Sequence, residues 1–380
     1  MLTVPGDAIL FDSDTHVMEG AETFAEYVDP QYRDRVPRFV TTGDGKNRFL
    51  VDDTFFPVVP LHPGFPKQYP DNGMEEYVLA NDPGQRLKYM DKIGIDVQVV
   101  FPSLALAGVT TSVRDPQLAG ALCRAYNRYI GEFASADPAR LRGVMVVPAN
   151  HPEVAAAELR FGKEQYGLSS FGLNPTPADG IPWSDHRYDP LWRTAEELGI
   201  TVLFHEVTTG YTAEGVGALR YTANWPMIYF SSHTVEPMLT IADLIFGGCA
   251  ERFPNLQFAF AEAHVSWLPG WLQLLDQNQA LAERVIPGKD LLNRKLSMLP
   301  SEYFGRQFYL MAFPDDRMIS EALQVAPNNI LLSSDWPHGI QKVHNVDGIF
   351  SVRNRTDLTD DDRDALLCRN PARLFGAKAN

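Results

Sequence analysis

Short apolar runs recur eight times along the chain, separated by longer segments in which apolar residues repeat at helical spacing. Most of the runs are rich in Val, Ile, Leu and Phe and show little alternation with polar residues, which is typical of parallel strands buried on both faces. We predict strands at Ile9–Phe11, Asp96–Phe101, Gly143–Val147, Ser169–Leu173, Thr201–Phe204, Leu256–Ala261, Phe308–Met311 and Ile330–Leu332.

The segments between these runs predict helices that connect the strands. Helical spacing extends over Gln85–Ile93, Pro116–Ala136, Pro152–Tyr166, Asp189–Leu198, Pro237–Phe253 and Leu268–Val285. Gly94, Gly167 and Gly199 each follow a predicted helix directly, which is the favoured position for a glycine that ends one. Repeated strand–helix units form parallel sheets with right-handed crossovers. Eight units indicate an α/β fold, the (β/α)8 or TIM barrel.

Two stretches interrupt the alternation, namely Asp29–Asn81 and Thr208–Met227. The first is polar and rich in proline and glycine, and the second carries glycines and aromatic residues. Long inserts in a compact domain are usually lids or binding arms. We therefore expect one barrel domain over residues 1–380, with loop insertions 29–81 and 208–227 covering the barrel mouth or a subunit interface. The same loops favour a homo-oligomer, most simply a dimer.

Composition and charge narrow the class of protein. The 380 residues are 45% apolar, which suffices for a packed core, and the net charge is −15. No basic stripe suggests binding to nucleic acid. No window approaches the ~18 uninterrupted apolar residues of a membrane span, and the first residues do not resemble a signal peptide. We expect a cytoplasmic protein whose separated Cys123, Cys249 and Cys368 are buried thiols.

Potential metal ligands follow three of the predicted strands. Asp14 and His16 are two residues apart after the first strand, so their side chains would point the same way. His205 follows the fifth strand and Asp335 the eighth. Alone, each has an ordinary structural explanation, for example a buried histidine or a helix cap at Asp335. Together, two imidazoles and two carboxylates on one rim of a barrel predict an open catalytic metal site.

The sixth strand ends in a second pair of this kind, Glu262 and His264. His264 is a candidate general acid or base, and both residues are candidates for contacting the ligands or a second ion. His338 lies three residues after Asp335 and could orient a ligand or contact substrate. Each of these side chains could instead be structural. Glu19 and Glu206 flank the ligand candidates and could support them or simply be solvated.

These motifs resemble the amidohydrolase superfamily, in the amidohydrolase-related subgroup that includes metal-dependent hydrolases and decarboxylases. The resemblance covers nearly the whole chain and rests on DSDTHVMEG, RLKYMDKIGIDVQVVFPS, ARLRGVMVVP, YDPLWRTAEELGITVLFHE, ERFPNLQFAFAEAHVSWLPGWLQLLD, ILLSSDWPH and NPARLFG. It implies a barrel with a divalent ion held by Asp14, His16, His205 and Asp335. It also implies an acid–base or substrate-polarising role for the residue at the end of the sixth strand.

Three departures from the superfamily pattern affect this prediction. The first motif is usually His-x-His or Glu-x-His, whereas this chain has Asp14-Thr15-His16. Decarboxylases of the subgroup resemble His-x-Gly-Glu-x-Leu-Pro at the sixth strand, but here Glu262 to Pro269 leave Glu262 and His264 both open as the catalytic residue. The fourth strand ends in Leu173-Asn174-Pro175, without the lysine that bridges two ions in other members.

Together, these observations and the resemblance predict a metal-dependent hydrolase or non-oxidative decarboxylase of a small organic acid, aromatic acids included. The expected catalytic residues are His264, Asp335 and Glu262, and the expected cofactor is zinc, with manganese or iron as alternatives. One alternative function is a dinuclear non-haem iron oxygenase on the same barrel. Another is a non-catalytic subunit with a vestigial metal site, which would act together with a related second chain.

Overall fold

The computed structural model describes residues 9–45, 47–55, 78–110, 113–206, 215–216, 221, 224–285, 296–338 and 349–376. Eight parallel strands form a nearly closed barrel in chain order. They are β1 (Phe11–His16), β5 (Val97–Phe101), β6 (Leu141–Val146), β7 (Ser170–Leu173), β8 (Thr201–Phe204), β9 (Phe258–Phe260), β10 (Phe308–Ala312) and β11 (Ile330–Leu332). Each overlaps a predicted strand, although β1 shares only Phe11 with the prediction and extends through the candidate ligands Asp14 and His16. The expected (β/α)8 barrel is confirmed.

The barrel closes between the last strand and the first. The amide of His16 donates to the carbonyl of Trp336, with 2.7 Å between nitrogen and oxygen. Earlier on the same strand, the Asp12 carboxylate accepts hydrogen bonds from the amide and the hydroxyl of Ser334, at 3.0 and 2.6 Å. The closing seam is therefore held partly by side chains that flank the predicted metal ligands.

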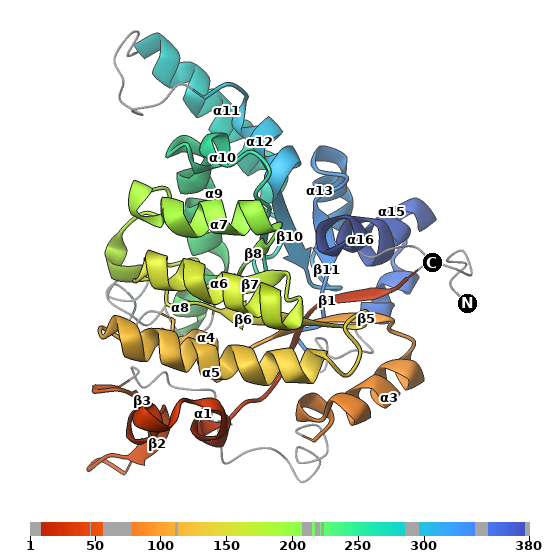
Figure 1. The fold of residues 1–380 in the computed structure, drawn as a ribbon. Coiled ribbons are helices and arrows are strands. Elements are labelled where there is room, and N and C mark those ends of the chain that lie inside the picture. Colours follow the sequence, from red (N-terminus) through yellow and green to blue (C-terminus); the bar gives the residue numbers. More distant parts are fainter. Residues whose placement is uncertain are drawn as a thin grey trace.

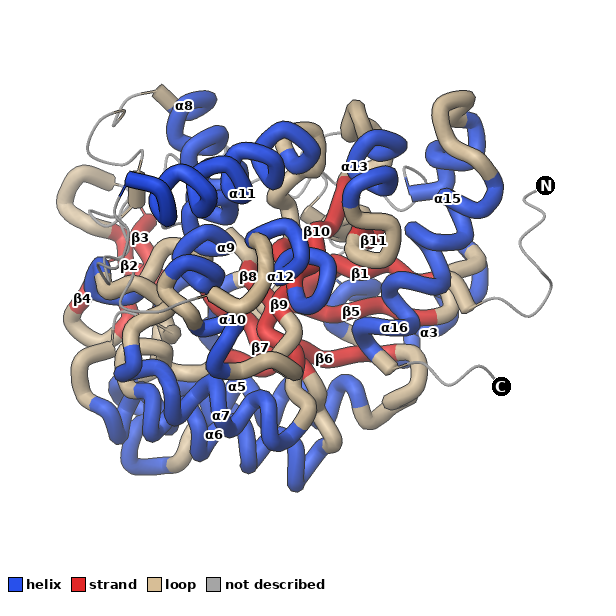
Figure 2. The backbone as a smooth tube through the Cα atoms, turned by 90° about the horizontal axis from the view of Figure 1, so that it is seen from above, coloured by secondary structure: helices blue, strands red, loops and turns tan. Residues whose placement is uncertain are grey.

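Helices surround the barrel, as the view from above shows (Figure 2). The larger ones are α3 (Pro83–Ile93), α5 (Pro116–Ala134), α6 (Pro152–Tyr166), α7 (Asp189–Leu198), α9 (Glu236–Phe246), α11 (Leu268–Val285), α12 (Pro300–Gln307) and α13 (Ile319–Val325). Helices α5, α6 and α7 lie side by side on one flank, and α11 projects from the body at the top of Figure 1. Gly94, Gly167 and Gly199 end α3, α6 and α7 with φ of 79°, 70° and 61°, as predicted.

The barrel interior is a packed apolar core. Inward-facing side chains from its strands form one buried cluster, including Phe11, Val99, Leu203 and Met311. Helix α16 (Asn370–Phe375) adds Leu374 and Phe375 to this cluster. The opposite, carboxyl-terminal ends of the strands are therefore the open rim on which polar side chains gather. No helix within the described ranges combines the length and hydrophobicity needed to cross a bilayer.

The inserts contain elements that the sequence pattern did not predict. Residues 29–55 include a three-stranded antiparallel sheet of β2 (Arg38–Thr41), β3 (Asn47–Val51) and β4 (Thr54–Phe55), preceded by α1 (Ala21–Tyr27). Asn81, at the end of this insert, exchanges hydrogen bonds with the backbone of Met18, just beyond β1. Residues 56–77, and most of 208–223, lie outside the described residues. That the inserts cover the mouth or join two copies stays a prediction.

Candidate metal centre

Strand β1 carries an irregularity where the first two candidate ligands lie. Asp12 and Thr15 pair with Gln98 and Val100, so three steps along β1 oppose two along β5. Such bulges redirect side chains and are common beside active sites. The side chains of Asp14 and His16 nevertheless approach each other, with 3.3 Å between His16 Nε2 and Asp14 Oδ1.

The structure brings together all four residues predicted as ligands. Asp14, His16, His205 and Asp335 each offer one donor atom, and these atoms lie within 4.8 Å of one another. His16 Nε2 is 3.2 Å from Asp335 Oδ1, and His205 Nε2 is 3.5 Å from Asp14 Oδ2. Metal bonds of about 2.0–2.2 Å in a tetrahedral site separate donor atoms by roughly 3.3–3.6 Å, so these spacings fit a single ion. All four side chains are buried.

Hydrogen bonds orient both histidines toward this point. His16 Nδ1 donates to the carbonyl of Pro102 at 2.9 Å, and His205 Nδ1 donates to the carbonyl of Glu206 at 2.7 Å. The Nε2 atoms and both carboxylate oxygens of Asp14 are buried without a hydrogen-bond partner. In neutral imidazoles, Nε2 would then direct a lone pair at a carboxylate. A cation between these atoms removes that conflict, so the residues present fit a metal ion.

The electrostatics of the cluster also favour a cation. Burial lowers the pKa of His16, but the carboxylates of Asp14 and Asp335 outweigh it and raise the pKa to about 10. Burial likewise opposes the charged form of His205, whose pKa is nevertheless raised by Asp14. Although burial raises the pKa of the Asp335 carboxyl, His338 and His16 hold it well below its usual range. Positive charge is therefore stabilised at the position where the four side chains meet.

His338, also predicted to act here, contacts the cluster without being one of the four. Its Nδ1 lies 3.1 Å from Asp335 Oδ1, and its Nε2 lies 2.7 Å from the hydroxyl of Ser103. The rings of His338 and His16 are 3.9 Å apart. This position is that of a residue that orients Asp335.

The two flanking glutamates are both buried. Glu19 accepts hydrogen bonds from the amides of Ser103 and Ala105, at 3.0 and 2.7 Å, and burial raises its pKa to about 7. It thereby fixes the loop after β5 that carries the partner of His338. Glu206 is likewise only 3% exposed, which excludes the solvated position allowed by the sequence.

The end of β9 carries two separate ion pairs. His264 Nδ1 lies 2.6 Å from Asp316 Oδ1, and about a third of the His264 side chain is exposed. Glu262 Oε2 lies 3.2 Å from Nε2 of His233, and both of these side chains are nearly buried. Glu262 and His264 have φ of 54° and 57°, and Asp335 has 57°, a conformation rare for residues with a side chain. Such strain concentrates at functional sites.

Three polar residues of this region were not predicted. Asp316 follows β10, so the rule that strand ends carry functional side chains would have found it. His233 lies on a helical segment, where no strand-end signal exists. Arg86 is completely buried and donates to the carbonyls of His16 and Ala80 and to Gln98, with its guanidinium over the Trp336 ring.

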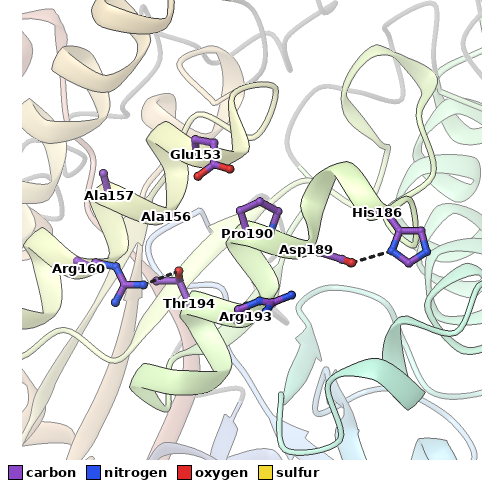
Figure 3. Close-up of a pocket in the computed structure, with 9 residues that line it drawn as sticks. All are labelled: Glu153, Ala156, Ala157, Arg160, His186, Asp189, Pro190, Arg193 and Thr194. Atoms are coloured by element: carbon purple, nitrogen blue, oxygen red, sulfur yellow. Dashed lines mark hydrogen bonds and ion pairs between the residues drawn. The ribbon is translucent and has the colours of Figure 1, made fainter.

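A groove of about 550 Å³ lies elsewhere, on the outer face of the barrel between α6 and α7 (Figure 3). Its lining includes Glu153, Arg160, His186, Asp189 and Arg193, and none of the predicted site residues is among those that line it. His186 and Asp189 form an exposed ion pair of 2.7 Å there. The groove is therefore separate from the metal centre and provides a comparison pair on the surface.

Comparison with known proteins agrees with this geometry. A sequence model of the amidohydrolase family matches residues 11–377. The chain belongs to the amidohydrolase family. This amidohydrolase is 23% identical to a γ-resorcylate decarboxylase of Polaromonas sp. over 301 residues, covering 77% of this chain and 86% of the relative. The superfamily expected from the motifs, and an enzyme of that superfamily, are thereby confirmed.

Solved structures share the fold of this amidohydrolase over almost its full length. An amidohydrolase from Mycobacterium avium subsp. paratuberculosis superposes with a TM-score of 0.76 at 18% identity, covering 97% of this chain and 99% of that one. A 5-carboxyvanillate decarboxylase from Novosphingobium aromaticivorans, with bound manganese and 3-methoxy-4-hydroxy-5-nitrobenzoic acid, gives a TM-score of 0.69 at 18% identity, covering 97% of each chain. These likenesses establish the barrel fold.

Proposed function

We propose that this amidohydrolase is a metal-dependent decarboxylase that removes the carboxyl group of an aromatic acid. The observation that carries the proposal is the cluster of Asp14, His16, His205 and Asp335, whose buried donor atoms converge on one point. The donor atoms of Asp14 and of the two histidines have no hydrogen-bond partner there. The similar γ-resorcylate and 5-carboxyvanillate decarboxylases support the reaction class.

A divalent ion would be held by these four side chains. Two imidazoles and two carboxylates suit zinc, manganese and iron alike. The sequence favoured zinc, but the manganese of the similar 5-carboxyvanillate decarboxylase makes manganese the first ion to test. When bound, the ion supplies Lewis-acid polarisation of substrate oxygen atoms. His338 keeps the Asp335 carboxylate oriented by its contact of 3.1 Å.

Decarboxylation also requires a proton donor for the carbon that loses the carboxyl group. The end of β9 offers two candidates, His264 oriented by Asp316 and Glu262 paired with His233. Both lie at the carboxyl-terminal rim of the barrel, the same rim as the four ligand candidates. We therefore propose that the proton reaches the substrate from this strand.

The pairing of the remaining side chains supports one ion rather than two. His338 is engaged by Asp335 and Ser103, Glu262 by His233, and His264 by Asp316. A dinuclear oxygenase would need some of these groups as ligands of a second ion. A vestigial site in a non-catalytic subunit would not need to retain all four convergent donors. The mononuclear decarboxylase uses every group as the structure places it.

Carbon dioxide release by the manganese-loaded protein tests this proposal. Purified protein is incubated with γ-resorcylate or 5-carboxyvanillate in parallel with and without oxygen, and the His205→Ala variant and chelator-treated protein serve as controls. We expect CO2 to appear in proportion to the acid consumed, and only with the metal-loaded wild type. Turnover that requires iron and consumes oxygen would contradict the proposal in favour of an oxygenase. Activity that appears only after a related chain is added would favour the partner-subunit alternative.

A further inference from the structure

Helix α8 (Trp225–Phe230) passes into α9 through a π-helical turn, Ser231–Val235, that carries His233. A π-helical turn widens the helix locally and is found mostly where a particular side-chain position is needed. Here it carries a histidine that contacts the Glu262 carboxylate. The distortion therefore points to His233 as a residue with a function.

Four contacts fix the His233 ring. It stacks on the ring of Tyr229, with 3.8 Å between centroids and 16° between planes. Its Nδ1 lies 3.1 Å from the Tyr229 carbonyl and 2.9 Å from the Ser232 hydroxyl. Its Nε2 lies 3.2 Å from Oε2 of Glu262, and the two side chains are only 12% and 11% exposed.

These contacts indicate where the protons lie. A carbonyl oxygen only accepts, and the Ser232 hydroxyl itself donates to the Tyr229 carbonyl at 3.2 Å, so the arrangement favours a proton on Nδ1 of His233. An unprotonated Nε2 would then direct its lone pair at the Glu262 carboxylate. A second proton between Nε2 and Oε2 removes that repulsion. The pair then shares this proton along the line between Nε2 of His233 and Oε2 of Glu262.

Glu262 also interacts electrostatically with two histidines of the metal centre, His205 and His338. Among the titratable side chains of the described residues, those that interact electrostatically with Glu262 come from several elements: Tyr229 on α8, His205 after β8, His264 after β9 and His338 after β11. His205 is a candidate ligand and His338 orients another. Glu262 has a positive φ of 54°, so its side chain leaves the backbone in a direction different from that in an extended strand.

We propose that His233 and Glu262 hold one proton in common, which Glu262 delivers to the substrate carbon; this rests on the proposed decarboxylase function. The bond between that carbon and the carboxylate breaks, and CO2 leaves. The electron pair of the broken bond forms the new C–H bond with the delivered proton. A proton from water then restores the pair, and the hydroxide left behind combines with CO2 as bicarbonate. Glu262 is the catalytic residue, and His233 is a positioning residue that acts through it.

The first test reads the protonation state of His233 without depending on activity. Full-length protein labelled with ¹⁵N- and ¹³C-histidine is loaded with diamagnetic zinc, and the His233 signal is identified by its absence from His233→Gln. At the pH at which the metal-loaded protein is assayed, we expect both nitrogens of His233 to carry a proton in the wild type, because Nδ1 faces a carbonyl and Nε2 a carboxylate. In Glu262→Gln the ring should be neutral with its proton on Nδ1. A neutral ring protonated only on Nε2 in the wild type would overturn the proposal.

The second test is kinetic and uses CO2 release by the metal-loaded protein. Glu262→Gln should lower kcat by ~10²–10⁴-fold, the usual effect of losing a general acid, with unchanged metal content. His233→Gln should lower kcat less than Glu262→Gln does and should change the pH profile of kcat, with KM little changed, because Glu262 then lacks the imidazole that shares its proton. His186→Gln removes a histidine from an exposed histidine–carboxylate pair on the outer groove (Figure 3). This variant should change neither kcat nor its pH profile.

The two arms separate this inference from the proposed function. Near-normal turnover by Glu262→Gln in an otherwise active decarboxylase would overturn the proton delivery and leave the proposed function standing, with His264 as the donor to examine next. A wild type that releases no CO2 would remove the delivery step together with the proposed function. The shared proton would then stand or fall by the histidine spectra alone.

Discussion

The backbone amide of Asp335 donates a hydrogen bond to the backbone carbonyl of Asp14, with 3.0 Å between nitrogen and oxygen. This bond lies at the seam where the segment after β11 meets β1. It brings two candidate metal-binding carboxylates from opposite ends of the chain to the same place. Closure of the barrel and assembly of the centre are therefore one structural event, and changes at the seam should affect both stability and metal binding.

The seam is tested by Asp12→Ala. Asp12 is fully buried, and its loss would leave the amide and hydroxyl of Ser334 without their acceptor. We expect the free energy of unfolding, measured by urea denaturation, to fall by ~1–3 kcal/mol. Asp357→Ala removes an exposed partner of Arg355 and should change it by about 0–1 kcal/mol. Equal stability of Asp12→Ala and wild type would show that this contact does not hold the seam.

Removing one ligand should empty the centre. His205 is oriented by the carbonyl of Glu206 and contributes one of the converging donor atoms. We expect His205→Ala to lose most of its bound metal, measured by inductively coupled plasma mass spectrometry, while its circular dichroism spectrum remains that of a folded barrel. His186→Ala, at an exposed position, should retain its metal. Full occupancy in His205→Ala would exclude His205 from the site.

Metal binding should depend on pH. In the metal-free protein burial opposes protonation of His16, but Asp14 and Asp335 raise its pKa to about 10, so at neutral pH a proton occupies the position of the ion. Binding must displace this proton, and affinity should therefore rise as the pH rises from about 6 to about 8. Calorimetry in two buffers of different ionisation enthalpy counts the protons released. An affinity that is constant over this range, with no proton release, would rule out this coupling.

Arg86 should support the centre from behind β1. Its guanidinium donates to the His16 carbonyl at 3.1 Å and to Gln98 at 2.8 Å. Burial lowers its pKa to about 9, so the group is a costly one to keep in the interior. Lysine cannot reproduce these divergent hydrogen bonds, and we expect Arg86→Lys to lower the free energy of unfolding by ~1–3 kcal/mol and to weaken metal binding.

The control for Arg86 is a matched substitution at the surface. Arg160→Lys changes a side chain that is about half exposed and pairs with Glu197 at 3.5 Å. The free energy of unfolding and the metal affinity of Arg160→Lys should equal those of the wild type. If Arg86→Lys behaved in the same way in both measurements, the hydrogen bond to the His16 carbonyl would have no role in holding the centre.

The barrel could be predicted from the sequence because its signals are local. Strands buried on both faces produce unbroken apolar runs such as Thr201–Phe204, and glycines with positive φ, such as Gly167, end the helices between them. The helix predicted over Pro237–Phe253 is in fact two, α9 and α10 (Cys249–Arg252). Gly248 separates them with a φ of 75°, which the spacing of apolar residues does not reveal.

The candidate ligands were predictable for the same reason, since each lies in the last part of a strand or within three residues of its end. The residues that surround them were not, because their roles depend on contacts between distant segments. His233 reaches Glu262 only through a π-helical turn, and Ser103 meets His338 across 235 positions of sequence. Trp336 packs in the interior against Tyr89 and the Arg86 guanidinium, contacts that its position after Asp335 does not reveal.

Anomalous X-ray scattering from manganese-soaked crystals tests the central claim, a single ion held at the barrel seam. The measurement locates manganese directly, without reference to any substrate. We predict one peak, within bonding distance of Asp14, His16, His205 and Asp335. Two peaks, with Glu262 or His264 among the ligands of the second, would favour the dinuclear alternative. A peak away from all four residues, or none, would contradict the metal centre described here.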